Sequence, residues 1–140
     1  MNSTIQAAPS GSKLLNISLW IAQVLIAVAF CMIGFIKLTT PIADLSKMMA
    51  WSGEYPEAFV RAIGLIDLAG GLGMLLPSLT RIMPRLTVIA AMAAAVLQIL
   101  AISFHVSRGE AALTPLNFVL LALILFILWG RSKKAPIAPR

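Results

Sequence analysis

Long apolar stretches separated by short polar segments dominate the pattern of this chain. The stretches cover approximately residues 14–38, 57–76, 86–106 and 116–129. About 20 apolar residues in an α-helix are enough to cross a hydrocarbon core of about 30 Å. The pattern therefore predicts an all-α protein, a four-helix transmembrane bundle whose spans are antiparallel because short loops join them.

The segments outside the spans differ in composition. Residues 1–13 are small and polar, which predicts a disordered lead-in before a four-span domain over residues 14–130. Residues 131–140 form a basic tail. Between the first two spans, Thr40 and Pro41 resemble a helix start, and apolar positions then repeat on one side. This predicts an interfacial helix over 41–51, with a plain loop as the alternative.

The composition supports a membrane protein. Apolar residues make up 60% of the 140 positions, charged residues only 11%, and the mean hydropathy is +0.96. A soluble domain of this size normally has about 25% charged residues. The net charge of +6 comes from basic residues that flank the spans, so no nucleic acid partner is expected. One cysteine excludes an internal disulfide, one histidine excludes a bis-histidine haem, and no metal site is expected.

Basic residues near the ends of the spans indicate the orientation. With four spans, both termini and the loop between the second and third spans share one side of the membrane. That side carries seven basic residues and the other carries four, namely Lys37, Lys47, Arg61 and Arg108. The excess predicts that both termini are cytoplasmic. The lipid bilayer is thus the expected environment, and the protein is a multi-pass component of the cell membrane, or of the inner membrane in a bacterium.

One carboxyl group falls in the middle of an apolar stretch. Asp67 lies ten residues from Glu57 and ten from Pro77, which places it about 15 Å from each end of a helix. Gly64 and Gly71 share its helix face and would let another helix approach closely. Asp67 is therefore expected to point into the bundle, either as a proton acceptor or as a purely structural group.

Other polar residues fall near the outer ends of the predicted spans. Gln98 and His105 share one helix face, and Gln98 is a candidate partner of Asp67. We expect one polar site, with two candidate catalytic residues, Asp67 and His105, and four candidate substrate-binding residues, Lys37, Gln98, Glu110 and Asn117. We also expect Lys37, His105 and Glu110 to act together at its outer mouth.

Some of these residues have simpler interpretations. Lys37 could extend to the lipid headgroups, as lysines near helix ends do. His105 could be a structural hydrogen-bonding group, and Arg108 could pair locally with Glu110.

Four ordered segments resemble the DoxX-like family of small four-helix membrane proteins. They are GFIKL (34–38), RAIGLIDLAGGLGMLLP (61–77), HVSRGE (105–110) and PLN (115–117), with WGR (129–131) closing the last span. The resemblance implies that Lys37, Asp67, His105, Glu110 and Asn117 stand at the characteristic polar positions of the family. Asp67 replaces the glutamate usual there, so the carboxyl group reaches one methylene less far.

The resemblance also suggests a function. DoxX is named for a membrane subunit of a thiosulfate:quinone oxidoreductase, although other relatives assist enzyme maturation or act as receptor chaperones. The chain has no soluble redox domain and one cysteine. It is therefore expected to be a membrane subunit or accessory protein of a quinone-linked redox system. Quinone is the candidate cofactor, and a redox protein is the candidate partner.

The alternative is a noncatalytic assembly factor or chaperone. Such a protein would pack the small-residue faces of the second and third spans against client helices. Catalysis by the chain itself and its oligomeric state stay open at this level.

The orientation can be tested with a reporter fused after residue 140. Because the basic residues favour a cytoplasmic tail, a reporter that is active only in the cytoplasm should be active, and one that needs export should be silent. The reverse pattern would overturn the orientation derived from the basic residues.

Overall fold

Four long helices account for most of residues 10–140, the part of the chain that the computed structural model describes. The elements in chain order are α1 (Ser10–Thr39), α2 (Ile42–Met48), the 3₁₀ turn η1 (Ala50–Gly53), α3 (Glu57–Thr80), α4 (Arg85–Ser107), the 3₁₀ turn η2 (Ala111–Leu113), α5 (Pro115–Trp129) and the π-helical turn η3 (Gly130–Lys134). No strand occurs within residues 10–140. The predicted all-α fold is confirmed.

All four long helices are suited to cross a membrane. The apolar segments are Lys13–Thr39, Glu57–Thr80, Arg85–Ser107 and Pro115–Lys134. Large apolar side chains point away from the bundle along each of them, for example Leu25, Leu65, Val96 and Val119. Such exposure suits a surface that meets lipid rather than water. The protein is therefore an integral, multi-pass membrane protein, as the sequence predicts.

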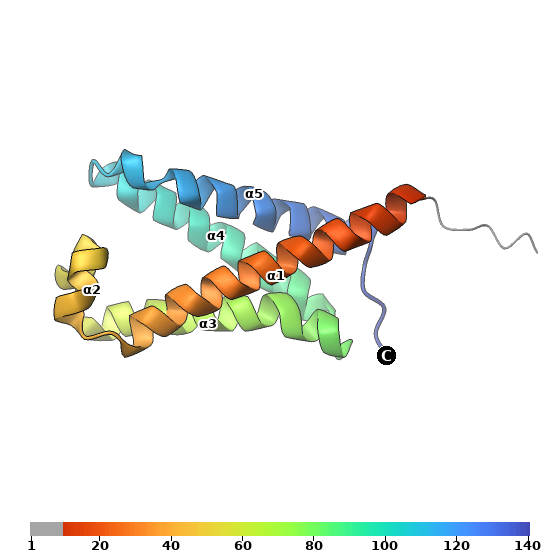
Figure 1. The fold of residues 1–140 in the computed structure, drawn as a ribbon, viewed down its shortest axis with the longest axis horizontal. Helices are drawn as coiled ribbons and strands as arrows, with labels where there is room; N and C mark the ends of the chain where they lie inside the picture. Colours follow the sequence, from red (N-terminus) through yellow and green to blue (C-terminus); the bar gives the residue numbers. More distant parts are fainter. Residues whose placement is uncertain (1–9) are drawn as a thin grey trace, which may run out of the picture.

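Helices α1 and α3 form the closest pair in the bundle. Helix α4 packs against α5 and α3 to a similar extent, and α1 also contacts α5. Figure 1 shows α1 crossing the bundle diagonally, while α2 stands at the end where the α4–α5 connection lies. The core between the helices contains Ile26, Phe30, Met74 and Ile124, all at most 2% exposed, together with small alanines of α4.

Glycine allows the close contact between α1 and α3. A Cβ atom on Gly34 would lie 2.7 Å from the carbonyl oxygen of Gly64 and 2.8 Å from the backbone nitrogen of Leu68. A Cβ atom on Gly71 would lie 2.7 Å from Sγ of Cys31. The small-residue face that carries Asp67 is thus buried against α1, as the sequence predicts.

Three boundaries differ from those expected. Helix α1 begins at Ser10, so residues 10–13 of the predicted lead-in are helical, whereas residues 1–9 lie outside the described part. Helix α3 does not stop at Pro77 but continues to Thr80. A proline removes only one backbone donor, and Ser78 in the next position is held by side-chain hydrogen bonds to other helices.

The third difference concerns the tail. Helix α5 runs on through η3, so the chain is still helical at Lys134, and Arg131 is only 3% exposed. The rest of the tail crosses the end of the bundle (Figure 1), where Arg81 donates a hydrogen bond to the Ala138 carbonyl group. The sequence places Arg131 in the basic tail, whereas helix packing buries it.

A helix is present where the sequence predicts an interfacial one, but it is shorter than 41–51. Helix α2 ends at Met48 because Met49 adopts an extended conformation, with φ −136° and ψ 91°. The chain then turns through η1, and Leu45 of α2 is fully buried. The connection is therefore anchored on the bundle.

The glycine contact predicts the effect of adding one methyl group. Gly34→Ala should destabilise the bundle by about 1–3 kcal/mol, because the new Cβ would collide with backbone atoms that cannot move aside. Gly70→Ala is the matched control, since its Cβ would meet only the Phe30 ring, at 3.3 Å. The measurement is unfolding by SDS in mixed micelles. Equal stability of the two variants would contradict the close helix contact.

Candidate functional site

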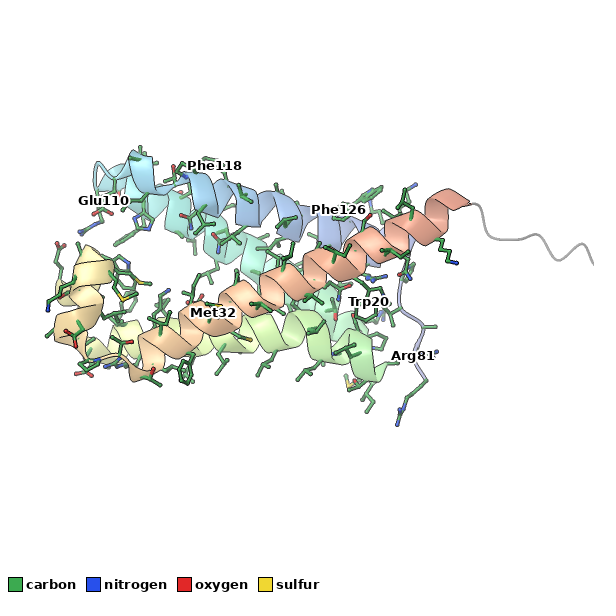
Figure 2. All side chains as sticks on the ribbon, in the orientation of Figure 1. Trp20, Met32, Arg81, Glu110, Phe118 and Phe126 are labelled. Atoms are coloured by element: carbon green, nitrogen blue, oxygen red, sulfur yellow. The ribbon has the colours of Figure 1, made fainter. Side chains whose placement is uncertain are left out.

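A cavity of about 670 Å³ lies at the end of the bundle where α2 stands. We call it the mouth cavity. Its wall contains all six residues predicted for the polar site: Lys37, Asp67, Gln98, His105, Glu110 and Asn117. The rest of the wall is largely apolar and includes Phe30, Trp51, Phe104 and Leu120. Glu110 is labelled in Figure 2 at this end of the molecule.

A buried ion pair lies at the deep side of the mouth cavity. Nζ of Lys37 is 2.8 Å from Oδ2 of Asp67, and the two side chains are 11% and 8% exposed. Lys37 therefore turns into the bundle rather than out to the headgroups. The glycine contact between α1 and α3 lies directly beside this pair, because a Cβ on Gly34 would also meet Cβ of Asp67 at 3.2 Å. The pair thus depends on how closely α1 and α3 approach.

Gln98 has a different partner from the one expected. Its Oε1 atom accepts a hydrogen bond of 2.9 Å from Nδ2 of Asn117. This bond joins α4 to α5 across the cavity wall, whereas Asp67 binds Lys37 of α1. Spacing along the chain places Gln98 on the inner face of its helix, but it does not determine which neighbour reaches it.

A second charged group lies at the outer rim. Nδ1 of His105 is 2.8 Å from Oε2 of Glu110, and Nε of Arg108 donates to the other oxygen of Glu110 at 3.1 Å. Arg108 also binds Glu54, at 2.6 Å, so the connection after α2 is tied to the α4–α5 connection. The expected pairing of Arg108 with Glu110 is therefore present together with a contact to His105. Lys37 does not join this group by any hydrogen bond or ion pair within the described residues.

The charges at the rim stabilise one another. The hydrogen bond from His105, followed by the contacts with Arg108, holds the pKa of Glu110 below its ordinary value of 4.5. The hydrogen bond from Arg108 likewise lowers the pKa of Glu54, and the bond to Glu54 raises the pKa of Arg108. The two carboxyl groups at the rim are thus held as carboxylates near neutral pH.

Aromatic side chains gather at the cavity on the side of η1. The Trp51 ring lies 5.6 Å from Nζ of Lys37 and packs edge-on against Phe104 at 6.0 Å. Tyr55 extends this cluster. Trp51 is not among the site residues predicted from the sequence. The available signal is its place at the end of the predicted interfacial helix, with Tyr55 and Phe59 following closely in the chain.

Another polar network was missed at the opposite end of the bundle. Gln23 accepts a 2.6 Å hydrogen bond from Nε of Arg131 and donates to Oγ of Ser78 at 3.1 Å. Ser78 in turn is 2.8 Å from the hydroxyl group of Thr87. These four buried residues connect all four long helices. The only signal in the sequence was the presence of Gln23 within the first apolar stretch.

Comparison with known proteins identifies one family. The sequence profile of the DoxX-like family matches residues 21–127, which is most of the chain and includes the whole wall of the mouth cavity. No curated protein and no solved structure matches the chain significantly.

The buried pair predicts unequal effects of two lysine substitutions. Lys37→Met should destabilise the fold by about 3–5 kcal/mol, because it leaves the Asp67 carboxylate buried without a counter-charge. Lys47→Met should change stability by less than about 1 kcal/mol, since Lys47 and Asp44 are 78% and 61% exposed. Unfolding by SDS in mixed micelles measures both.

A double variant separates the charge from the packing. Lys37→Met combined with Asp67→Leu removes both charges and should recover most of the stability lost by Lys37→Met alone. If the double variant lost as much stability as the two single variants together, a paired role of Lys37 and Asp67 would be contradicted.

Proposed function

The chain belongs to the DoxX-like family, and from this premise we propose that it is a membrane subunit or accessory protein of a quinone-linked redox system. The mouth cavity would bind the quinone headgroup. The observation that carries the proposal is the convergence of six polar side chains from α1, α3, α4, the η2 connection and α5 on one largely apolar cavity. The family resemblance supports the proposal because DoxX is named for a subunit of a quinone-reducing enzyme.

The cavity fits a quinone headgroup in size and chemistry. Small-molecule sites in proteins measure about 300–1,000 Å³ and combine apolar walls with a few polar groups, and the mouth cavity measures about 670 Å³. A quinone ring is flat and presents two carbonyl oxygens, so it needs apolar faces and hydrogen-bond donors. Phe30, Trp51 and Phe104 offer the faces. Lys37 of α1 and Asn117 of α5 offer donors.

Proton transfer would be the chemical contribution of the chain itself. A quinone takes up two protons with two electrons when it is reduced. His105, held by the Glu110 carboxylate 2.8 Å away at the rim, would exchange protons with water outside the membrane. Asp67, 2.8 Å from Nζ of Lys37, would hold or accept a proton at the deep side of the cavity. A partner protein would supply or accept the electrons.

The predicted orientation would place this chemistry at the non-cytoplasmic side of the cell membrane. The mouth cavity lies at the end of the bundle where α1 ends and α3 begins. This end is remote from the C-terminal segment (Figure 1). If both termini are cytoplasmic, protons exchanged at His105 come from the opposite compartment.

The packing weakens the alternative of an assembly factor. That function requires free small-residue faces on the second and third spans. Gly64 and Gly71 of α3 are instead covered by α1, and Ala91 and Ala94 of α4 are at most 3% exposed in the core. A client helix would have to bind another surface.

Binding of a short-tailed benzoquinone to the protein in detergent tests the proposal. Trp51 lines the cavity, so the quinone should quench its fluorescence saturably, and Trp51→Phe should abolish that component. Asn117→Leu should weaken binding roughly three- to tenfold, which corresponds to one lost hydrogen bond. Ser103→Ala, a change on the exposed side of α4, should leave the affinity unchanged.

Two outcomes would contradict the proposed function. One is the absence of saturable quenching in the folded protein. The other is equal quenching in the wild type and Trp51→Phe, because the quinone would then only partition into the micelle.

A further inference from the structure

A second cavity, of about 700 Å³, lies at the other end of the bundle. We call it the basic cavity. Lys13 of α1, Arg81 after α3 and Lys134 of η3 line it, so three separate elements bring three cationic side chains to one place. Figure 2 shows Trp20 and Arg81 together at this end, far from Glu110.

No acidic residue neutralises these cations. The chain has five acidic residues, and none of them lines the basic cavity. Four belong to the connections and helix starts at the opposite end, namely Asp44, Glu54, Glu57 and Glu110, and Asp67 is paired with Lys37. The basic cavity is therefore a region of uncompensated positive charge.

A buried guanidinium group lies directly behind the wall of the basic cavity. Arg131 is 3% exposed, and its Nη1 donates to Oδ1 of Asn16 at 2.7 Å and to the Ala135 carbonyl group at 2.9 Å. Asn16 and Ala135 line the cavity. The guanidinium group also lies 5.1 Å from the centre of the Trp20 ring, which lines it too.

Arg131 has no anionic partner. No described carboxylate forms an ion pair with it. Its buried Nη2 atom has no hydrogen-bond partner among the described residues. A buried charge without a counter-charge is expensive, and an unpaired buried donor adds to that cost. Because its hydrogen-bond partners Asn16 and Ala135 line the basic cavity, the charge of Arg131 would add to the attraction of an anion bound there.

We propose that the basic cavity binds the phosphodiester headgroup of an anionic phospholipid. Phosphate oxygens accept hydrogen bonds from guanidinium and ammonium groups, and basic cavities between membrane helices suit such headgroups. Lys13 and Lys134 stand at the first and last positions of two membrane spans, which is the level of the headgroups. Leu79 and Ile137 add apolar wall beside the cations, as the glycerol and acyl part of a lipid requires.

The test uses the full-length protein in neutral detergent and native mass spectrometry, with phosphatidylglycerol and phosphatidylcholine as probes. Phosphatidylglycerol should bind saturably and at least about fivefold more tightly, because choline cancels the charge of the phosphate. Inorganic phosphate at comparable concentration should not displace the lipid. Displacement would mean that the site takes a soluble anion and would overturn the assignment to a lipid.

Neighbouring lysines offer a matched pair of variants. Lys134→Gln should weaken phosphatidylglycerol binding roughly fivefold, the effect of about 1 kcal/mol for one basic group at the headgroup level. Lys133→Gln should change it less than about twofold, because Lys133 is exposed and does not line the cavity. Arg131→Gln should weaken phosphatidylglycerol binding more than Lys134→Gln does, provided that the variant folds. The comparison of Lys134→Gln with Lys133→Gln does not depend on this third variant. Equal losses in the two lysine variants, or equal binding of the two lipids, would overturn the proposal.

Discussion

A charged side chain inside a membrane bundle needs a partner, and the pair between Lys37 and Asp67 meets this need only because α1 and α3 lie very close together. Gly34 and Gly64 remove the side chains that would keep the helices apart. With α1 held against α3, Lys37 points inward and its Nζ lies 2.8 Å from Oδ2 of Asp67. The same contact fixes the deep wall of the mouth cavity, so helix packing and the proposed chemistry rest on one feature.

The two ends of the bundle have opposite electrostatic character. At the mouth cavity, each cation has an acid beside it: Lys37 with Asp67, and Arg108 with Glu110 and Glu54. In the proposed function, Asp67 and His105 at this end hold or exchange protons. At the basic cavity, cations lie without carboxylates, and Arg131 is stabilised only by neutral oxygens and an aromatic ring. That end suits an anion that binds from outside the chain rather than proton transfer.

Local sequence patterns were enough to predict most of the fold. Apolar stretches give the number of spans because lipid leaves an isolated chain no stable alternative to a helix that satisfies its own backbone. The ends of the helices were less predictable. Pro77 would normally end a helix, but it lies inside α3, because contacts with neighbouring helices hold the residues after it. The sequence contains the proline but not those contacts.

The sequence by itself determined which polar residues lie at membrane depth and on inner helix faces, because hydropathy and helical period depend only on near neighbours in the chain. It thereby placed Lys37, Asp67, Gln98, His105, Glu110 and Asn117 in one region, and these residues line one cavity. Tertiary structure decided which side chains meet. Asp67 binds Lys37 rather than Gln98, and Arg131 of the basic tail is buried in the bundle. Which side chains become partners depends on the distances and rotations between the helices. The glycine contacts and the connecting turns set these distances and rotations together, and no local sequence pattern encodes them.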